Sequence, residues 1–466
     1  MRDTIGDPEA RACGSSDDAP LGNLLPKIVV RPPGPASTRI AERLALAESR
    51  NVTYRGDDFP VFWSEARGAN VRDVDGNIYL DLTSAFGVSA AGHGHPKIVE
   101  AIRLQAGRLI HGMGDVHPPE VKVALLERLC ALSPWNESRG ILASAGSEAV
   151  EIALKTAQLA TGRPGVIAFE GSYHGLTLGA LSTTAREDFR APFLERLPDS
   201  VSFVPFPDPA KNQEEERARS LSALDHAIEV AEEAGRQPGA VIVEPIQGRA
   251  GVRIPPTGFL SGVAKRTRQA GAVLIFDEIF TGFGRTGSLF AFQEEGVIPD
   301  LLCLGKALGG GLPLSCCLGR VEVMDAWPRS EGESIHTSTF LGHPLSCAAS
   351  LTFLEILEEE GLPARAAEEG NRFCSLLSEA LASCAHLIQV RGRGMFVGLE
   401  LDTGLSPTGP GPGARTAAAL LAKGLMVLPA GSLGEVVEIT PPLTIAREQL
   451  DWAIEVLTDR VSGLGS

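Results

Sequence analysis

Long runs of lysine and arginine are absent from this sequence, and its 466 residues carry a formal net charge of -16. A protein that binds a nucleic-acid backbone needs a basic surface, so we expect no nucleic-acid partner. None of the eight cysteines forms a Cys-x-x-Cys pair, which leaves a zinc ribbon or dithiol motif without support, and we expect no metal site. Cysteines scattered along a long chain are typical of reduced, mostly buried thiols, so a cytoplasmic location is predicted.

Long hydrophobic runs are also scarce. The opening MRDTIGDPEA has no basic stretch followed by an apolar core, so no secretory signal is predicted. The segment LLCLGKALGGGLPLSCCLG (301–319) is long enough to suggest a membrane span. Because it contains a lysine, three consecutive glycines and a proline, a buried strand followed by a loop explains it better, and we expect no membrane partner.

What is present indicates a globular α/β protein. Apolar residues make up 44% and charged residues 21% of a chain long enough for two or three packing units. Short apolar runs alternate with helical stretches in its middle, and continuous apolar strands indicate a parallel sheet covered on both faces. The predicted strands are 166–169, 201–206, 240–245, 272–278 and 300–305.

Four segments are predicted along the chain. Residues 1–36 are polar and rich in proline and glycine, which favours a flexible N-terminal arm. Residues 37–90 are expected to form the N-terminal part of a small domain, 91–343 a large domain, and 344–466 the C-terminal part of the small α+β domain.

Three local patterns give sharper predictions. VRDVDGNIYLDL (71–82) alternates apolar and polar residues around Asp-Gly, which predicts a hairpin. HPKIVEAIRLQAGRLIHG (95–112) has helical spacing, with a proline suited to the first turn and Gly112 to the stop. PTGPGPGA (407–414) predicts a surface loop.

Lys306 stands at the end of an apolar strand, before a glycine loop. Desolvation lowers the pKa of an amine and makes it a nucleophile toward an aldehyde. The alternative is a lysine whose stem is buried while its ammonium group reaches solvent.

Asp277 ends another fully apolar strand, in LIFDEIFTGFGRTG. A buried carboxylate needs a cationic or donor partner. A protonated pyridine nitrogen would be one such partner, and a buried ion pair with an arginine such as Arg285 is the alternative.

Two further stretches contain groups that suit a cofactor. Ser144-Ala-Gly-Ser-Glu-Ala opens an apolar helix, whose free N–H groups and positive dipole end suit a phosphate, although an ordinary helix cap has the same pattern. FEGSYHG (169–175) places Tyr173 and His174 beside two glycines. The tyrosine could lie flat on a cofactor ring, or it could be half-buried in a plain turn.

Together, in this order, these stretches resemble the class III aminotransferases, which belong to the pyridoxal-phosphate (PLP) dependent fold type I group with ornithine and 4-aminobutyrate aminotransferases. The resemblance runs from about residue 60 to the C-terminus. The stretches that carry it are SAGSEAVEIALKTA, FEGSYHG, VEPIQG, FDEIFTGFGRTG, LGKALGGGLPL, HTSTFLGHPLSCAA, VRGRGMFVGLEL and EITPPLTI.

The resemblance implies a large PLP-binding domain, a smaller domain built from both termini, and transfer of an amino group from an amine or amino acid to a keto acid or aldehyde. It implies that Lys306 forms the Schiff base with PLP and that Asp277 faces the pyridine nitrogen. Tyr173 would lie against the ring face with His174 beside it, and Glu244 would orient Asp277 and the ring surroundings.

The resemblance also implies a homodimer with shared active sites. Gly146 and Ser147 would bind the phosphate, and Thr339, in HTSTF, would reach the phosphate of the neighbouring subunit.

Departures from the family pattern concern the substrate. Leu176 stands where relatives that bind carboxylates have an arginine, and Arg249 and Glu438 exchange the charges of a glutamate–arginine pair. We hypothesise that Arg249 and Glu438 face each other and that Arg249 binds the substrate carboxylate; the alternative is that both are solvated. Phe280 replaces a glutamine, and Phe86 suggests a more apolar substrate pocket.

Two other functions remain open at this point. An amino-acid epimerase or an aminomutase would use the same lysine without releasing a keto product, and a PLP-fold protein could bind without catalysis. The sequence names neither the donor nor the acceptor.

Overall fold

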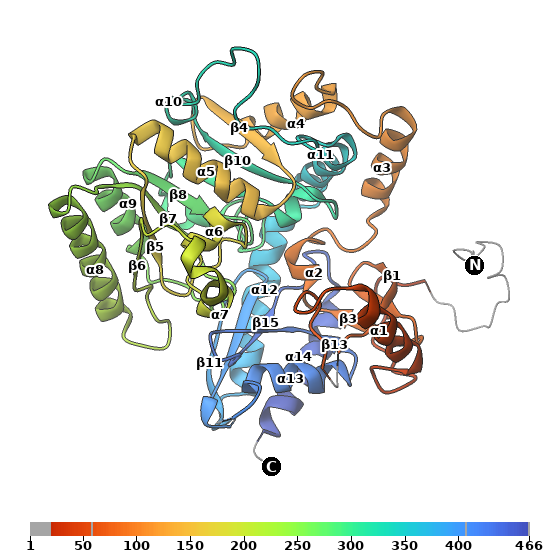
Figure 1. Ribbon diagram of the computed structural model, residues 1–466. Coiled ribbons are helices and arrows are strands. Elements are labelled where there is room, and N and C mark those ends of the chain that lie inside the picture. The colour runs from red at the N-terminus through yellow and green to blue at the C-terminus, as the bar shows by residue number, and fades with distance from the viewer. Residues whose placement is uncertain (1–19, 57–58, 406–407, 465–466) are drawn as a thin grey trace.

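The computed structural model describes residues 20–56, 59–405 and 408–464. A seven-stranded sheet forms the centre of a large domain, in the order β4-β10-β9-β8-β7-β5-β6 (Figure 1). Its strands run in one direction except β10, which is antiparallel to β4 and to β9. The bounds are β4 (Ser138–Ala143), β10 (Ser315–Arg320), β9 (Leu301–Leu304), β8 (Val273–Asp277), β7 (Pro238–Val243), β5 (Gly165–Phe169) and β6 (Val201–Val204).

Helices cover both faces of this sheet, which is why its central strands are apolar throughout. In β7, Ala240 and Ile242 pack in one apolar cluster with α5, whereas Val241 and Val243 pack in another with α9. The sequence-based prediction of a mainly parallel α/β sheet is confirmed. The helices of this domain are α4 (Glu120–Ala131), α5 (Gly146–Thr161), α6 (Leu178–Thr183), α7 (Glu187–Arg190), α8 (Gln213–Glu233), α9 (Phe259–Gln269) and α10 (Val321–Met324), with 3-10 turns at η2 (Ala191–Arg196), η3 (Ala291–Glu295) and η4 (Lys306–Gly309).

Both ends of the chain build the smaller part, where red and blue segments lie side by side in Figure 1. One of its sheets has the order β1-β2-β3-β13, and β13 from the C-terminal part pairs in parallel with β3 from the N-terminal part. The other sheet has the order β11-β12-β15-β14. The strands are β1 (Trp63–Arg67), β2 (Asn70–Asp73), β3 (Ile78–Asp81), β11 (Leu387–Arg393), β12 (Phe396–Leu401), β13 (Leu425–Met426), β14 (Leu428–Ala430) and β15 (Val436–Ile439).

The remaining helices surround these sheets or connect them to the large domain. They are α1 (Pro35–Ala47), α2 (Ser84–Gly87), α3 (Pro96–Arg108), α11 (Pro344–Glu359), α12 (Leu362–Ala380), α13 (Pro412–Leu421), α14 (Arg447–Ser462) and the 3-10 turn η5 (Thr403–Leu405).

The predicted hairpin is confirmed, because β2 and β3 pair antiparallel around the Asp-Gly turn. The predicted stop of the next helix at Gly112 is wrong, since α3 ends at Arg108. There the side-chain amide of Gln105 donates to the carbonyl of Leu109, which satisfies an acceptor at the helix end. The predicted loop 407–414 is wrong in its last part, because α13 begins at Pro412, where a proline suits the first turn.

The predicted arm, residues 1–36, differs in its described part. Residues 20–34 pack on the small sheet, and α1 begins at Pro35. The buried Asn70 accepts N–H groups of this stretch, and Asn77 accepts two more further along. Residues 20–34 are thus held on the sheet by hydrogen bonds to side-chain amides, whereas their polar composition offers few apolar contacts.

The segment 301–319 forms β9, η4 and most of β10, so the strand-and-loop interpretation is confirmed. Within the described ranges, no helix combines the length and the apolar character needed to cross a membrane.

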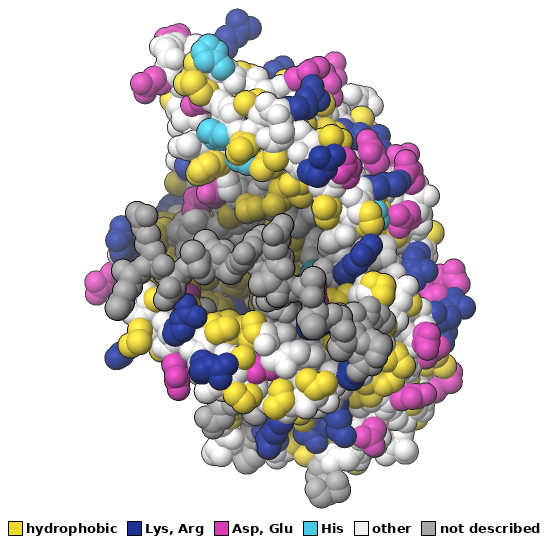
Figure 2. Space-filling view, turned by 90° about the vertical axis from the view of Figure 1, so that its right-hand side faces the viewer, with side chains coloured by type: hydrophobic (Ala, Val, Ile, Leu, Met, Phe, Trp, Pro, Cys, Tyr) yellow, Lys and Arg dark blue, Asp and Glu magenta, His cyan; other side chains and the backbone are white. Residues whose placement is uncertain are grey.

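One side of the molecule exposes large hydrophobic side chains on and after α3. Figure 2 views this side and shows hydrophobic side chains gathered around a hollow. The exposed residues of this stretch include Val99, Leu104, Leu109, Ile110, Met113 and Val116. Farther along the chain, Phe340 is 56% exposed, and its ring lies 5.3 Å from that of His111. The exposed apolar side chains of the two segments therefore belong to one surface.

Candidate active site

Lys306 is the first residue of η4, directly after β9. Its φ of +47° lies in the left-handed region, which costs a non-glycine residue roughly 1–3 kcal/mol and is typical of functional sites. Burial lowers the pKa of the Lys306 amine to about 8. The amine is thus desolvated, as the sequence predicts.

Asp277 ends β8, the strand beside β9. Its carboxylate is buried; one oxygen lies 2.7 Å from Nδ1 of His174 and the other accepts the N–H of Ile279. The alternative ion pair with Arg285 is wrong, because that guanidinium donates to the carbonyls of Met395 and Pro441 instead.

Glu244 follows β7 and fixes the turn that contains Tyr173. Its carboxylate accepts the N–H of Tyr173 at 2.9 Å and that of Gly248 at 3.2 Å. Burial raises the pKa of Glu244 to about 7. The ring of Tyr173 is partly buried and packs edge-on to Phe189, with 5.8 Å between centroids.

Gly146 and Ser147 open α5, and Gly175 brings the Tyr173–His174 turn against them. Gly175 has a φ of +124°, and a Cβ there would lie 2.4 Å from Cβ of Ser147. Only glycine permits this approach. A Cβ on Gly146 would lie 3.0 Å from Ile279, which follows Asp277 by two residues. The helix N-terminus, the turn and the end of β8 therefore meet.

Phe86 lies in a strained segment that contacts η4, the turn that begins at Lys306. Ser84, Ala85 and Phe86 have φ values of +47°, +49° and +61°, a left-handed turn of three non-glycine residues. This turn, α2, contacts η4, and the Phe86 side chain is 56% exposed. No pattern in the sequence indicated this backbone conformation.

Phe280 has a contact that the sequence did not reveal. Nζ of Lys306 lies 3.2 Å from the centroid of the Phe280 ring. The ring packs on Phe396 at 4.7 Å and fills a space that a Cβ on Gly87 or Gly248 would enter. Its position three residues after Asp277, which ends β8, was the feature of the sequence that placed Phe280 near the site.

Neither oxygen of Glu438 has a hydrogen-bond partner, so Arg249 and Glu438 form no hydrogen-bonded pair, although Arg249 is the positive charge that acts most strongly on Glu438. The hypothesis that the two side chains face each other stays a prediction. Glu438 lies in β15 and is 1% exposed, so the alternative of a solvated glutamate is wrong. Burial raises the pKa of Glu438, while the positive charges of Arg249, Lys306 and Arg285, in that order, oppose the shift. Both residues of the exchanged pair therefore contribute charge to the surroundings of Lys306.

Two of the residues singled out in the sequence are exposed. Thr339 lies in the segment between α10 and α11, and Leu176, which directly follows Gly175, is 49% exposed. Within the described part of one chain, no hydrogen bond, ion pair or ring contact joins Thr339 to Lys306, so its expected role in a second subunit stays a prediction.

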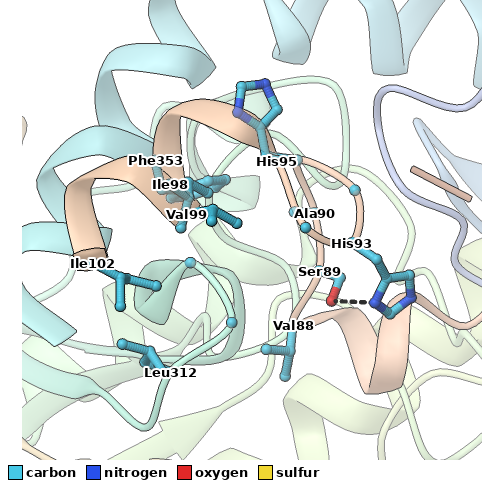
Figure 3. A pocket seen from close by; sticks show the side chains of 15 residues that line it. Val88, Ser89, Ala90, His93, His95, Ile98, Val99, Ile102, Leu312 and Phe353 are labelled. Carbon is cyan, nitrogen blue, oxygen red and sulfur yellow. Dashed lines mark hydrogen bonds between the residues drawn. The ribbon is translucent and has the colours of Figure 1, made fainter. Parts of the chain in front are cut away.

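A pocket beside the cluster does not contain these residues. Figure 3 shows that it is lined by residues 88–95, by α3 and by residues 310–312 after η4. In it His93 lies 3.2 Å from Oγ of Ser89. The candidate site is therefore the cluster around Lys306 rather than this pocket.

Comparisons with known proteins agree with this arrangement. The sequence model described as Aminotransferase class-III matches residues 52–461. The chain is 37% identical to the acetylornithine aminotransferase of Methanothermobacter thermautotrophicus, over 87% of this chain and 95% of that protein. It is 34% identical to the 4-aminobutyrate aminotransferase of Mycobacterium leprae, over 93% and 97%. It is also 32% identical to an alanine/serine racemase of Pyrococcus horikoshii, over 93% and 92%.

A solved structure shows the same fold. The ornithine aminotransferase of Toxoplasma gondii, which has PLP at partial occupancy in its active site, superposes with a TM-score of 0.80 at 28% identity, covering 92% of this chain and 94% of that one. The chain is therefore a member of the class-III aminotransferases, PLP-dependent enzymes of fold type I that move an amino group from an amine or amino acid to a keto acid or aldehyde.

Proposed function

We propose that Lys306 is the group that binds PLP covalently and moves protons at the substrate. The observation that carries this proposal is a desolvated amine at the end of β9, beside a buried carboxylate at the end of β8. At neutral pH, an amine with a pKa of about 8 is unprotonated in roughly a tenth of the molecules, against fewer than one in a thousand for a solvated lysine. Lys306 can therefore act as nucleophile and as base.

The chemistry of the cluster fits PLP. Its aldehyde suits the amine of Lys306, its ring nitrogen suits the buried Asp277, and its phosphate suits the N-terminus of α5 at Gly146 and Ser147. When bound, PLP supplies a conjugated ring that takes up the electron pair released at the substrate carbon.

The other residues of the cluster position Asp277 and the ring. Asp277 is held by the N–H of Ile279 and by His174, and we propose that its negative charge keeps a proton on the ring nitrogen. Glu244 holds the backbone of Tyr173, whose ring would cover one face of the cofactor.

The substrate site lacks the usual carboxylate clamps and includes an apolar side chain. Leu176 and Phe86 favour an amine or amino compound with a hydrophobic portion. Arg249 is the guanidinium in electrostatic range of Lys306 that could bind a carboxylate when the substrate has one.

We infer a homodimer with shared active sites, located in the cytoplasm. Exposed hydrophobic side chains on and after α3 favour burial against a second copy. Phe340, next to Thr339, belongs to this surface. We propose that the partner subunit's Thr339 completes the phosphate site. The cysteines of the described ranges are all unpaired, in keeping with a reducing compartment.

A donor panel tests the function. The purified protein with PLP is mixed with amines and amino acids, and the cofactor is followed by absorbance as it takes up the amino group. Borohydride treatment should attach the cofactor to Lys306, and mass spectrometry of the peptides would detect the attachment. An unmodified Lys306 would overturn the proposal.

Racemisation is the second candidate, because a racemase is among the relatives. It predicts inversion of a single amino acid and exchange of its α-hydrogen with solvent, without an added keto acid. If these occur while no donor converts the cofactor to its amino form, racemisation replaces amino transfer.

A further inference from the structure

Glu438 is a buried carboxylate without a partner. Its side chain is 1% exposed, and neither carboxylate oxygen has a hydrogen bond. The backbone lies within the sheet, where β15 pairs with both β12 and β14. Buried polar side chains are nearly always bonded, so two free oxygens on one carboxylate require an explanation.

The other carboxylates near Lys306 are bonded. Asp277 is bonded to His174 and Ile279, and Glu244 accepts two N–H groups. Glu278 accepts from Oγ of Thr281 and from two N–H groups after it. Among these four residues, Glu438 alone has both oxygens free.

None of the cations around Glu438 forms a hydrogen bond to its carboxylate. Arg285 is committed to backbone carbonyls, and the amine of Lys306 is the group that we assign to PLP. Arg249 acts on Glu438 through its charge but makes no hydrogen bond to it. Burying a charged group without a bonded partner is costly, so the site is incomplete without a further donor.

The charge of Glu438 also acts on the reactive amine of Lys306. The end of its strand meets the same place, because Oγ of Ser84 donates to the carbonyl of Thr440, directly after β15, and the turn that begins at Ser84 contacts η4. A substrate that reacts at Lys306 therefore comes close to Glu438. Beside the amine of Lys306, the ring of Phe280 packs on Phe396, so this side of the amine is apolar.

We propose that the amino donor carries a second ammonium group and that Glu438 binds this group while the first amine reacts at Lys306. This inference rests on the proposed function and names the substrate class. A diamine and a diamino acid share the required ammonium; a diamino acid would add a carboxylate for Arg249. In a site without water, a charge-assisted hydrogen bond between Glu438 and the second ammonium group discriminates strongly against an amino donor that has no such group.

The experiment compares two donors of equal chain length, diaminopentane and aminopentane, with free lysine as the diamino-acid arm. We expect the wild-type protein to prefer a donor with two amino groups. Glu438→Gln should lower kcat/KM for that donor by about 10- to 100-fold and leave aminopentane within about threefold. Glu435→Gln, which removes one negative charge just before the same strand, should change neither.

A binding measurement provides a readout without turnover. Borohydride-treated protein, which cannot react, is titrated with diaminopentane in a calorimeter. Wild-type protein should bind it at least about tenfold more tightly than Glu438→Gln protein.

The outcomes separate the inference from the proposed function. Equal losses with aminopentane and diaminopentane, or an unchanged preference in Glu438→Gln, would overturn the ammonium site. If no amine reacts and Lys306 stays unmodified by borohydride, the proposed function fails, and the calorimetric comparison still decides whether Glu438 binds an ammonium group.

Discussion

Nζ of Lys306 lies 3.2 Å from the centre of the Phe280 ring, over its face. An aromatic face attracts an ammonium group by about 0.5–2 kcal/mol, whereas a neutral amine gains little. Phe280 therefore opposes the burial that lowers the pKa of Lys306. The contact also holds the amine at a fixed position when it is not bonded to PLP.

Replacing Phe280 by leucine should lower the pKa of Lys306 further, by about 0.5–1.5 units, because the side chain stays apolar but loses its aromatic face. The measurement is competitive acetylation of Lys306 in protein without PLP, followed against pH by mass spectrometry. Phe396→Leu is the matched control, since the Phe396 ring packs on Phe280, whereas the cation–π contact of Lys306 is with Phe280. An unchanged or raised pKa in Phe280→Leu would show that the ring does not stabilise the ammonium.

Glu244→Gln should change the pH dependence of stability. The pKa of Glu244 is raised from 4.5 to about 7 by burial, so the folded protein binds an extra proton between these values. The stabilisation from this group is complete below pH 4.5 and is lost as the pH rises through about 7. A carboxamide does not ionise, so the variant should gain up to about 3 kcal/mol relative to wild type on going from low pH to about pH 8.

Denaturant unfolding of protein without PLP, at about pH 5 and about pH 8, measures this difference. The variant should also bind PLP more weakly, because a carboxamide accepts well from only one of the N–H groups of Tyr173 and Gly248. A difference in stability that does not depend on pH would contradict the raised pKa.

Gly175→Ala should destabilise the protein by roughly 2–4 kcal/mol and reduce its affinity for PLP. The new Cβ meets Ser147 at 2.4 Å and the φ of +124° disfavours any side chain. Relief of the clash moves the Tyr173–His174 turn away from α5. Gly332→Ala is the control, because Gly332 has a φ of +120° but no atom within 4 Å of the added Cβ. Equal melting temperatures for the two variants would show that close approach to Ser147 is unimportant.

The sequence predicted the elements of this site better than its contacts. Each predicted strand of the central sheet exists, and Asp277 and Lys306 end adjacent strands, because apolar runs and strand-end polar residues are local signals. The contacts of Phe280 and the free carboxylate of Glu438 depend on packing between segments far apart in the chain. The exchange of charges at Arg249 and Glu438 was visible in the sequence, but the absence of a hydrogen bond to the Glu438 carboxylate was not.

Residues 20–34 give a second example of contacts that the sequence could not predict. The predicted arm has no apolar periodicity, yet Asn70 and Asn77 hold its described part on the sheet through side-chain amides. Composition contains no information about such partners, because each asparagine lies dozens of residues away from the backbone that it binds.

The left-handed turn at Ser84–Phe86 gives a final prediction, in which stability and substrate binding change in opposite directions. Ala85 has a φ of +49°, which costs an alanine about 1–2 kcal/mol but costs a glycine little. Glycine also loses more chain entropy on folding, which offsets part of this gain. Ala85→Gly should therefore stabilise the free protein by a net amount of about 0.5–1 kcal/mol. The same change loosens the backbone of α2, which contains Phe86 and contacts η4, so KM for hydrophobic donors should rise several-fold. Ala422→Gly, at a helix end with a φ of -64°, makes the same chemical change without strain to relieve and should destabilise instead. Unfolding midpoints of both variants, measured with KM for one aminoalkane, decide the matter: a less stable Ala85→Gly protein would mean that this turn stores no strain.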